Sequence, residues 1–123
     1  MKVTAKKNEQ MANMVFATIY PLYCNRLEKN GRTKEEFHQV IEWLTGFDEE
    51  KLQQLIDEQV TFKTFFKQAT INPNAEMIRG VVCGYRIEEI PEEFEVYKQC
   101  RRMEKLIDEL AKGRKMEKVL RTL

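Results

Sequence analysis

The stretch from Met11 to Asn25 contains no charged side chain, although 33% of all residues in the chain are charged. Its apolar residues wrap most of the way round a 3.6-residue period, and a helix that is apolar on nearly every side is a buried one. The stretch, extended to about Leu27, therefore predicts a central helix on which the other segments pack. Because proline removes a helical hydrogen bond, Pro21 predicts a kink or a break within this helix.

Several classes of protein are disfavoured by composition. The uncharged stretch is too short and too polar for a membrane span, and the sequence before it lacks the features of a signal peptide. The net charge of +1 gives no overall attraction to nucleic acid or to an anionic membrane. The three cysteines are odd in number and widely spaced, which argues against a disulfide framework. Together these features predict a cytoplasmic protein that does not associate with membranes.

Local signals divide most of the chain into short helices. Thr33 opens a capping box, and Asp48 and Thr61 are suitable N-caps for the next two helices. Pro91 opens the longest helix, whose apolar seam has the four-three spacing of packed bundles. Residues 115–123 form a last amphipathic piece.

These segments predict an all-α fold, a compact orthogonal bundle of about six or seven short-to-medium helices. The length of 123 residues fits a single helical domain over residues 1–123. Residues 1–10 are polar and basic, and we expect them to form a flexible arm.

The chain after Asn72 fits two interpretations. Asn72 followed by Pro73 is typical of a helix start, which favours a helix to about Cys83 and then an extended connector, Gly84–Ile90. Because one strand without a partner makes no sheet, we favour this helix over a strand. The alternation that would indicate a strand is found at Val81, Cys83, Tyr85 and Ile87.

Five strings in the sequence share their order and spacing with one bacterial family. They are Tyr20-Pro21-Leu22-Tyr23, Gly31-Arg32-Thr33-Lys34-Glu35, Trp43-Leu44-Thr45-Gly46-Phe47, Val82-Cys83-Gly84-Tyr85-Arg86-Ile87-Glu88-Glu89-Ile90 and Asp108-Glu109-Leu110-Ala111-Lys112-Gly113. From about residue 13 to the C-terminus, the chain resembles the family called domain of unknown function 2200. The resemblance implies a stand-alone bacterial cytosolic protein, and it carries over no activity.

No side chain is assigned a catalytic role from the sequence. His38 is the only histidine, and its position favours an exposed helix residue that interacts with Glu42. The chain contains no serine, which excludes a Ser-His-Asp triad. The cysteines lack the short spacing of structural zinc sites, so we expect no metal and no cofactor.

Tyr85 and Arg86 are the candidate binding residues, because non-helical backbone between packed helices is where binding groups concentrate. The planar guanidinium of Arg86 suits a carboxylate or a phosphate. In the competing interpretation, Arg86 pairs with Glu88 or Glu89 while Tyr85 covers the core. Trp43 also has two interpretations, which are core packing and a surface patch that faces a protein partner.

The favoured function is a non-catalytic interaction or regulatory module that binds a protein partner or a second copy of the chain. The alternative is a protein that binds a small molecule or anion, or an enzyme, through the Gly84–Ile90 connector. Nucleic acid is a poor candidate partner, since the basic cluster over residues 112–121 has no interleaved aromatic side chain.

Overall fold

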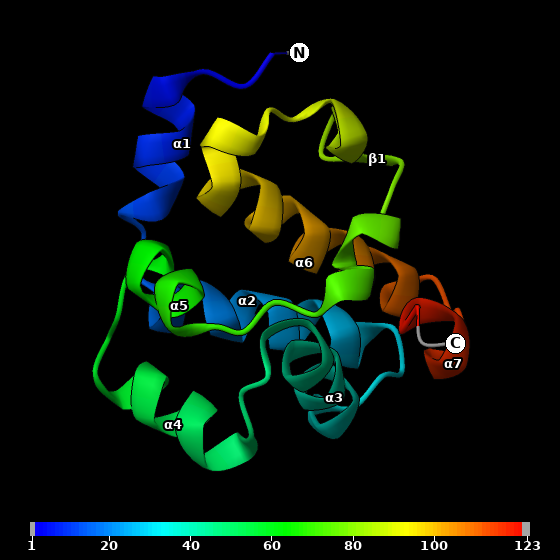
Figure 1. Ribbon diagram of the computed structural model, residues 1–123. Helices are drawn as coiled ribbons and strands as arrows, with labels where there is room; N and C mark the ends of the chain where they lie inside the picture. Colours follow the sequence, from blue (N-terminus) through cyan, green and yellow to red (C-terminus); the bar gives the residue numbers. More distant parts are fainter. Residues whose placement is uncertain (1, 122–123) are drawn as a thin grey trace.

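Short helices surround one long helix, α6, in the computed structural model, which describes residues 2–121 (Figure 1). Within these residues the predicted all-α class is confirmed, since seven α-helices accompany one two-stranded hairpin. The α-helices are α1 (Ala5–Ala12), α2 (Phe16–Lys29), α3 (Lys34–Thr45), α4 (Glu49–Asp57), α5 (Phe62–Gln68), α6 (Glu95–Ala111) and α7 (Met116–Val119). The hairpin consists of β1 (Val81–Val82) and β2 (Tyr85–Arg86), and 3-10 helices span Pro73–Met77, Ile87–Glu89 and Glu92–Phe94.

Helix α6 occupies the centre of the fold and contacts α1, α2, α3, α5 and α7 (Figure 1). It begins at Glu95, later than the predicted start at Pro91, because the chain first makes a 3-10 turn. Its predicted apolar seam is buried at Cys100, Met103, Ile107 and Leu110. The central position expected for the uncharged stretch therefore belongs to α6.

The uncharged stretch is broken, and the break lies before Pro21. Helix α1 ends at Ala12, and α2 begins at Phe16 and continues through Pro21 without interruption. Between the two helices, Val15 pairs with Thr61 in an isolated antiparallel bridge. The main-chain N–H of Phe16 donates to the carbonyl of Val60 at 2.9 Å. Pairing with a distant segment thus replaces the helical hydrogen bonds at this point.

The expectation of a flexible arm over residues 1–10 is wrong, because most of this segment forms helix α1 against α6. The hydroxyl of Thr4 caps the helix by accepting a hydrogen bond from the main-chain N–H of Lys7 at 3.2 Å. The side-chain carbonyl of Asn8 accepts the main-chain N–H of Tyr97 at 3.0 Å. Asn8 therefore satisfies an N–H that the first turn of α6 leaves without a helical partner.

The helix signals between residues 33 and 64 are confirmed. Thr33 and Glu36 form both hydrogen bonds of the capping box, and the Asp48 carboxylate accepts the main-chain N–H of Lys51 at 2.8 Å. Thr61 caps α5 in the same way. Each of these caps lies within four residues of its partner, which is why the sequence pattern alone identifies them. The predicted last helix is α7, and residues 122–123 of that prediction lie outside the described residues.

The expected helix from Pro73 to Cys83 is wrong beyond Met77, where a single 3-10 helix ends. The chain then forms the β1–β2 hairpin, in which Val82 pairs with Tyr85. Its two turn residues, Cys83 and Gly84, have φ angles of 51° and 81°. Two successive positive φ angles are typical of a type I′ turn, which joins antiparallel strands tightly. The alternation seen in the sequence was therefore the correct signal.

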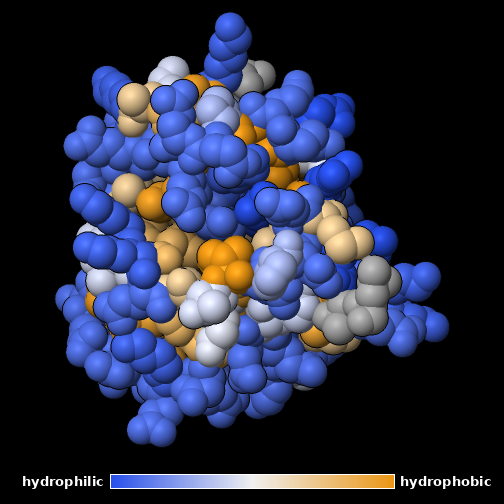
Figure 2. Space-filling model, viewed as in Figure 1, coloured by the Kyte–Doolittle hydropathy of each residue, from blue (hydrophilic) through white to orange (hydrophobic). Residues whose placement is uncertain are grey.

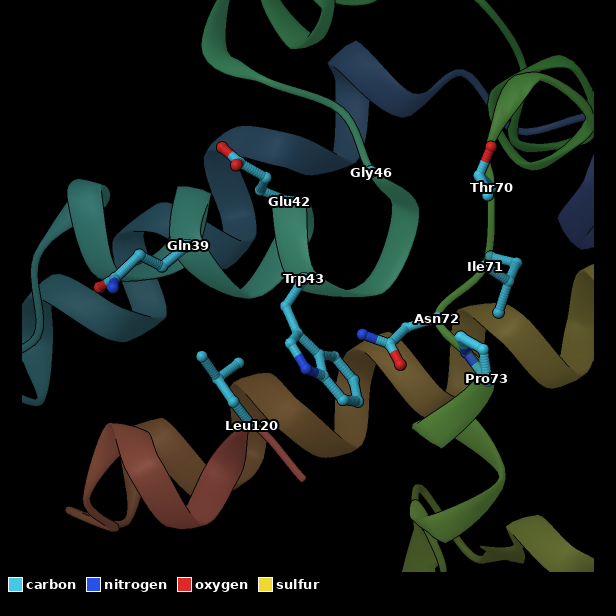
Figure 3. Close-up of a pocket in the computed structure, with 9 residues that line it drawn as sticks. All are labelled: Gln39, Glu42, Trp43, Gly46, Thr70, Ile71, Asn72, Pro73 and Leu120. Carbon is cyan, nitrogen blue, oxygen red and sulfur yellow. The ribbon is translucent and has the colours of Figure 1, made fainter. Parts of the chain in front are cut away.

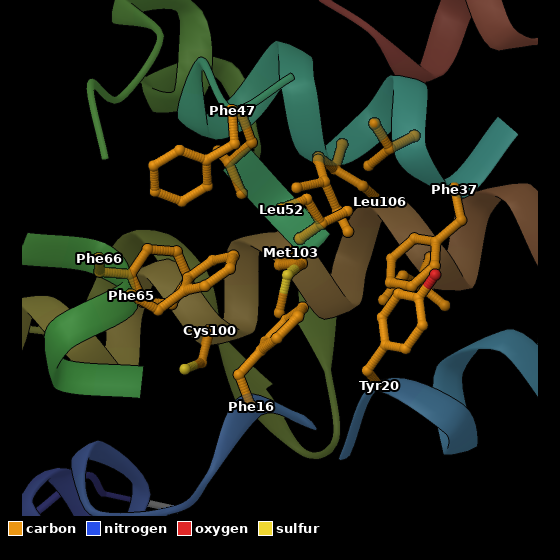
Figure 4. Close-up of a cluster of buried hydrophobic side chains, with 14 of the residues drawn as sticks. Phe16, Tyr20, Phe37, Phe47, Leu52, Phe65, Phe66, Cys100, Met103 and Leu106 are labelled. Atoms are coloured by element: carbon orange, nitrogen blue, oxygen red, sulfur yellow. The ribbon is translucent and has the colours of Figure 1, made fainter. Parts of the chain in front are cut away.

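Aromatic side chains form much of the hydrophobic core, as Figure 4 shows. The rings of Phe16 and Phe65 stack with their centroids 4.3 Å apart, and Tyr20 stacks on Phe37 at 5.6 Å. Burying one such side chain stabilises the fold by about 1.5–3 kcal/mol.

On the face seen in Figure 2, hydrophilic residues cover most of the surface and apolar residues gather near the middle.

Candidate functional site

Tyr85 is buried under the hairpin with 6% of its surface exposed. Its ring meets that of Tyr97 edge to face, with centroids 5.4 Å apart. The guanidinium of Arg101 lies over both rings, 5.1 Å from the centroid of Tyr85 and 4.8 Å from that of Tyr97. Cations over aromatic faces attract the ring quadrupole. Tyr85 therefore packs in a small hydrophobic cluster, in agreement with the interpretation from sequence in which Tyr85 covers the core.

The hydroxyl of Tyr85 has a hydrogen-bond donor outside this small core. The ammonium group of Lys7, on α1, donates to it at 2.9 Å. This hydrogen bond lowers the pKa of Tyr85, because a donor favours the ionised phenol. Burial raises the pKa of its neighbour Tyr97 to about 12. The two tyrosines in contact thus differ in the ease with which they lose a proton.

Arg86 lies beside Tyr85 but points outward, and 54% of its side chain is exposed. Its Nε is 3.8 Å from a carboxylate oxygen of Glu89, whose side chain is 66% exposed. That distance is too long for a hydrogen bond, so the ion pair expected from the sequence is present but loose. Ile87 donates its N–H to the Gly80 carbonyl at 2.9 Å. Along antiparallel strands, residue pairs that exchange main-chain hydrogen bonds alternate with pairs that do not. Arg86 lies one residue before Ile87, so the main-chain N–H of Arg86 points away from β1.

Tyr85 and Arg86 line a groove of about 630 Å³ between the hairpin and the segment that precedes α1. This volume lies within the range of small-molecule sites. We call it the hairpin groove, and it is lined by Lys2, Val3, Val81, Gly84, Tyr85, Arg86, Glu89, Ile90 and Pro91. Its walls combine apolar side chains with two cations and one carboxylate.

Trp43 lines a different cavity, of about 550 Å³, which shares no lining residue with the hairpin groove. The indole projects from α3 and lies between Leu120, beside α7, and the segment at Asn72 and Pro73 (Figure 3). It is partly buried and packs against the core. The structure therefore brings Tyr85 and Arg86 together and places Trp43 apart from them.

Comparison with known proteins gives a family and no activity. The family model described as "Uncharacterized protein conserved in bacteria (DUF2200)" matches residues 10–121. The chain belongs to this DUF2200 family. It is also similar to the crystal structure of uncharacterized protein SP1917, with 38% sequence identity, a TM-score of 0.83 and coverage of 91% of each chain. No curated protein matches the chain.

One wall of the hairpin groove lies outside the part that matches the DUF2200 model. Lys2 and Val3 line the groove from before residue 10. Lys7, which donates to the hydroxyl of Tyr85, also precedes residue 10. Sequence reasoning missed these residues because it treated residues 1–10 as an arm. Thr4, a good N-cap residue, was the signal that could have indicated a docked helix.

His38 does not pair with Glu42, which corrects the interpretation from sequence. Its Nε2 lies 2.5 Å from the hydroxyl of Tyr20 on α2, and its Nδ1 lies 3.4 Å from a carboxylate oxygen of Glu49. Burial raises the pKa of Tyr20. Packing of α2 against α3 thus offers His38 an aromatic partner that helical spacing alone does not indicate.

The three cysteines are free thiols, two of them buried and one exposed. Cys24 and Cys100 are buried in the core, and Cys83 is exposed at the turn of the hairpin. Partial burial raises the pKa of Cys83, and the nearby Glu104 carboxylate adds to this effect. Between residues 2 and 121, no group of three or more His, Cys, Asp or Glu side chains is arranged to hold a metal ion.

The C-terminal basic cluster is largely engaged within the chain. Arg121 makes a two-point contact with the buried carboxylate of Glu109, at 2.7 and 2.8 Å, and Arg114 lies 3.2 Å from the same group. Asn74 donates to the main-chain carbonyl of Arg121 at 2.7 Å.

In the described part of the chain, none of the helices is long and apolar enough to cross a membrane.

Proposed function

We propose that this protein is a non-catalytic binding module and that its recognition site is the hairpin groove, which takes a small ligand with an anionic group. One observation carries the proposal. Arg86, on strand β2 of the hairpin, lines a groove of ligand size while its side chain is half exposed and only loosely paired. Its fork of donors is therefore available at the point where a ligand would enter.

Other groups around Arg86 support an anionic ligand. Its main-chain N–H faces away from β1, and Lys2 adds a second positive charge to the lining. Hydrogen bonds to charged groups contribute about 1.5–3 kcal/mol each, so two or three of them suffice for a weak to moderate complex. The apolar residues Val3, Val81 and Ile90 offer contact area for the body of the ligand.

The reactive side chains near the hairpin fit a binding role better than a catalytic one. The thiol of Cys83 has a raised pKa and so stays protonated near neutral pH. The only histidine, His38, is on α3 with Tyr20 and Glu49 as its neighbours, and it does not line the groove. We also propose a cytoplasmic location, which the free thiols support.

The test is a thermal-shift screen of carboxylates and phosphates with three proteins. We expect at least one anion to raise the melting temperature of the wild type and of Arg79→Gln, but not of Arg86→Gln. Arg79 is exposed, precedes the same hairpin and lies outside the groove lining, so its variant controls for the lost charge. Both variants should fold with nearly wild-type stability, because exposed pairs are worth little. A screen in which no anion stabilises the wild type would refute the proposal.

A second candidate function is association with a second copy of the chain through the face of α1 and α2. Leu22 is 61% exposed there, and it borders an apolar groove of about 280 Å³ that Met11, Met14 and Tyr23 also line. A projecting side chain beside a groove suits a two-fold interface, in which each copy fills the groove of the other. Sedimentation analysis of the wild type and of Leu22→Glu tests this candidate function. The wild type should sediment as a dimer, and Leu22→Glu should sediment as a monomer.

A further inference from the structure

Two opposite charges lie next to each other on the wall of the hairpin groove. The Arg86 guanidinium and the Glu89 carboxylate are 3.8 Å apart, and more than half of each side chain is exposed. Neither side chain makes a hydrogen bond to another group among the described residues. Each charge therefore has donors or acceptors left for a ligand, and the two face the same space.

A ligand that carried only negative charge would meet a mixed surface here. Its anionic group would be attracted by Arg86 and repelled by Glu89 at almost the same distance. An ammonium group next to the anionic group removes that conflict, because it can pair with Glu89 while the carboxylate pairs with Arg86. Lys2 lines the same groove and gives it a second cation.

We infer, on the basis of the proposed function, that the ligand of the hairpin groove is an α-amino acid or a similar zwitterion with an apolar side chain. The two charged groups of an α-amino acid are attached to one carbon, and their spacing is comparable to that of the two protein charges. Both ligand charges then form charge-assisted hydrogen bonds in one orientation, which fixes the ligand in the groove.

The rest of the groove selects the side chain. Val3, Val81, Ile90 and Pro91 supply an apolar wall beside the charged pair. Val81 is unusually open for an aliphatic residue, at 47% exposed. A ligand with an aliphatic side chain would cover this surface, and burial of apolar area is favourable. A zwitterion without a side chain, such as glycine, would leave the wall exposed and bind more weakly.

The test is a titration with three compounds that share one apolar body. These are leucine, 4-methylpentanoate, which lacks the ammonium group, and 3-methylbutylamine, which lacks the carboxylate. Calorimetry on the wild type should give leucine at least a tenfold tighter dissociation constant than either of the others. Glu89→Gln should remove the advantage of leucine over 4-methylpentanoate. The exposed Glu93, which does not line the groove, provides a matched control, and Glu93→Gln should keep that advantage.

The outcomes separate the inference from the proposed function. If 4-methylpentanoate binds the wild type as tightly as leucine and Arg86→Gln abolishes both, the zwitterion inference is overturned and the anion site stands. If neither leucine nor 4-methylpentanoate binds while another carboxylate or a phosphate stabilises the wild type, the zwitterion inference is overturned and the anion site stands. If no anion binds, or if the amine binds tightest, the proposed function itself is overturned. Glycine that binds as tightly as leucine would overturn the role of the apolar wall.

Discussion

The buried carboxylate of Glu109 should hold the end of the chain on the bundle, and Glu109→Gln should release it. Its side chain is only 8% exposed, and it contacts Arg121 at 2.7 and 2.8 Å and Arg114 at 3.2 Å. Glutamine keeps the size of the side chain but removes its charge and one acceptor. The guanidinium of Arg121, itself only 13% exposed, then loses its main compensation.

The expected cost follows from this geometry. Hydrogen bonds to charged groups contribute about 1.5–3 kcal/mol, and removal of one partner of a buried pair costs about 3–5 kcal/mol. Because glutamine retains one acceptor, we expect a loss of about 2–3 kcal/mol. For a domain of this size the loss corresponds to a fall of roughly 10 °C in melting temperature.

The single tryptophan provides a local assay. Trp43 lines a cavity together with Leu120, next to α7. If α7 detaches, water reaches the indole and its fluorescence emission shifts to longer wavelength. In Glu109→Gln this shift should begin below the temperature at which far-ultraviolet circular dichroism reports global unfolding.

Asp108 offers a matched control on the same helix. It pairs with Arg26 and Lys112, whose side chains are 46% and 74% exposed. Exposed partners of this kind contribute less than about 1 kcal/mol, so Asp108→Asn should leave the Trp43 emission unchanged until global unfolding. Equal losses of stability in Glu109→Gln and Asp108→Asn would refute the reasoning. So would a Glu109→Gln protein in which Trp43 fluorescence and circular dichroism change in a single transition.

Three further predictions concern other parts of the fold. Cys83 should react with iodoacetamide in the native protein, and the rate should keep rising to a higher pH than for an ordinary thiol because partial burial raises the pKa of Cys83. Cys24 and Cys100 are buried and should react only after unfolding, and mass spectrometry measures the modification of each cysteine. Gly84→Ala should cost about 1–2 kcal/mol in urea unfolding, since its φ is 81°. Arg102→Met should leave the unfolding free energy unchanged or raise it by about 1 kcal/mol, because this buried arginine has an Nε without a partner.

Features fixed by neighbouring residues could be predicted from the sequence. The caps at Thr33, Asp48 and Thr61 each bond to a main-chain N–H three residues later. By contrast, the break before α2 depends on the bridge between Val15 and Thr61, which are distant in sequence. Pattern reasoning has no access to such a contact, so it joined the uncharged residues into one helix.

The candidate site shows the same division. Tyr85 and Arg86 are adjacent in sequence, and their place between helices identified them as binding candidates. The opposite wall of the groove comes from Lys2 and Val3, far away along the chain. Trp43, which the sequence offers as a separate candidate for a partner-facing surface, lines a different cavity.

The position of the segment before α1 has a consequence for how this protein could change during evolution. The hairpin and α6 lie within residues 10–121, whereas Lys2 and Val3 precede that region. A few substitutions or insertions ahead of α1 would reshape one side of the groove without disturbing the core. The proposed ligand preference and the stability of the fold can therefore vary independently. Binding studies are best made without residues added ahead of Lys2, which lines the groove.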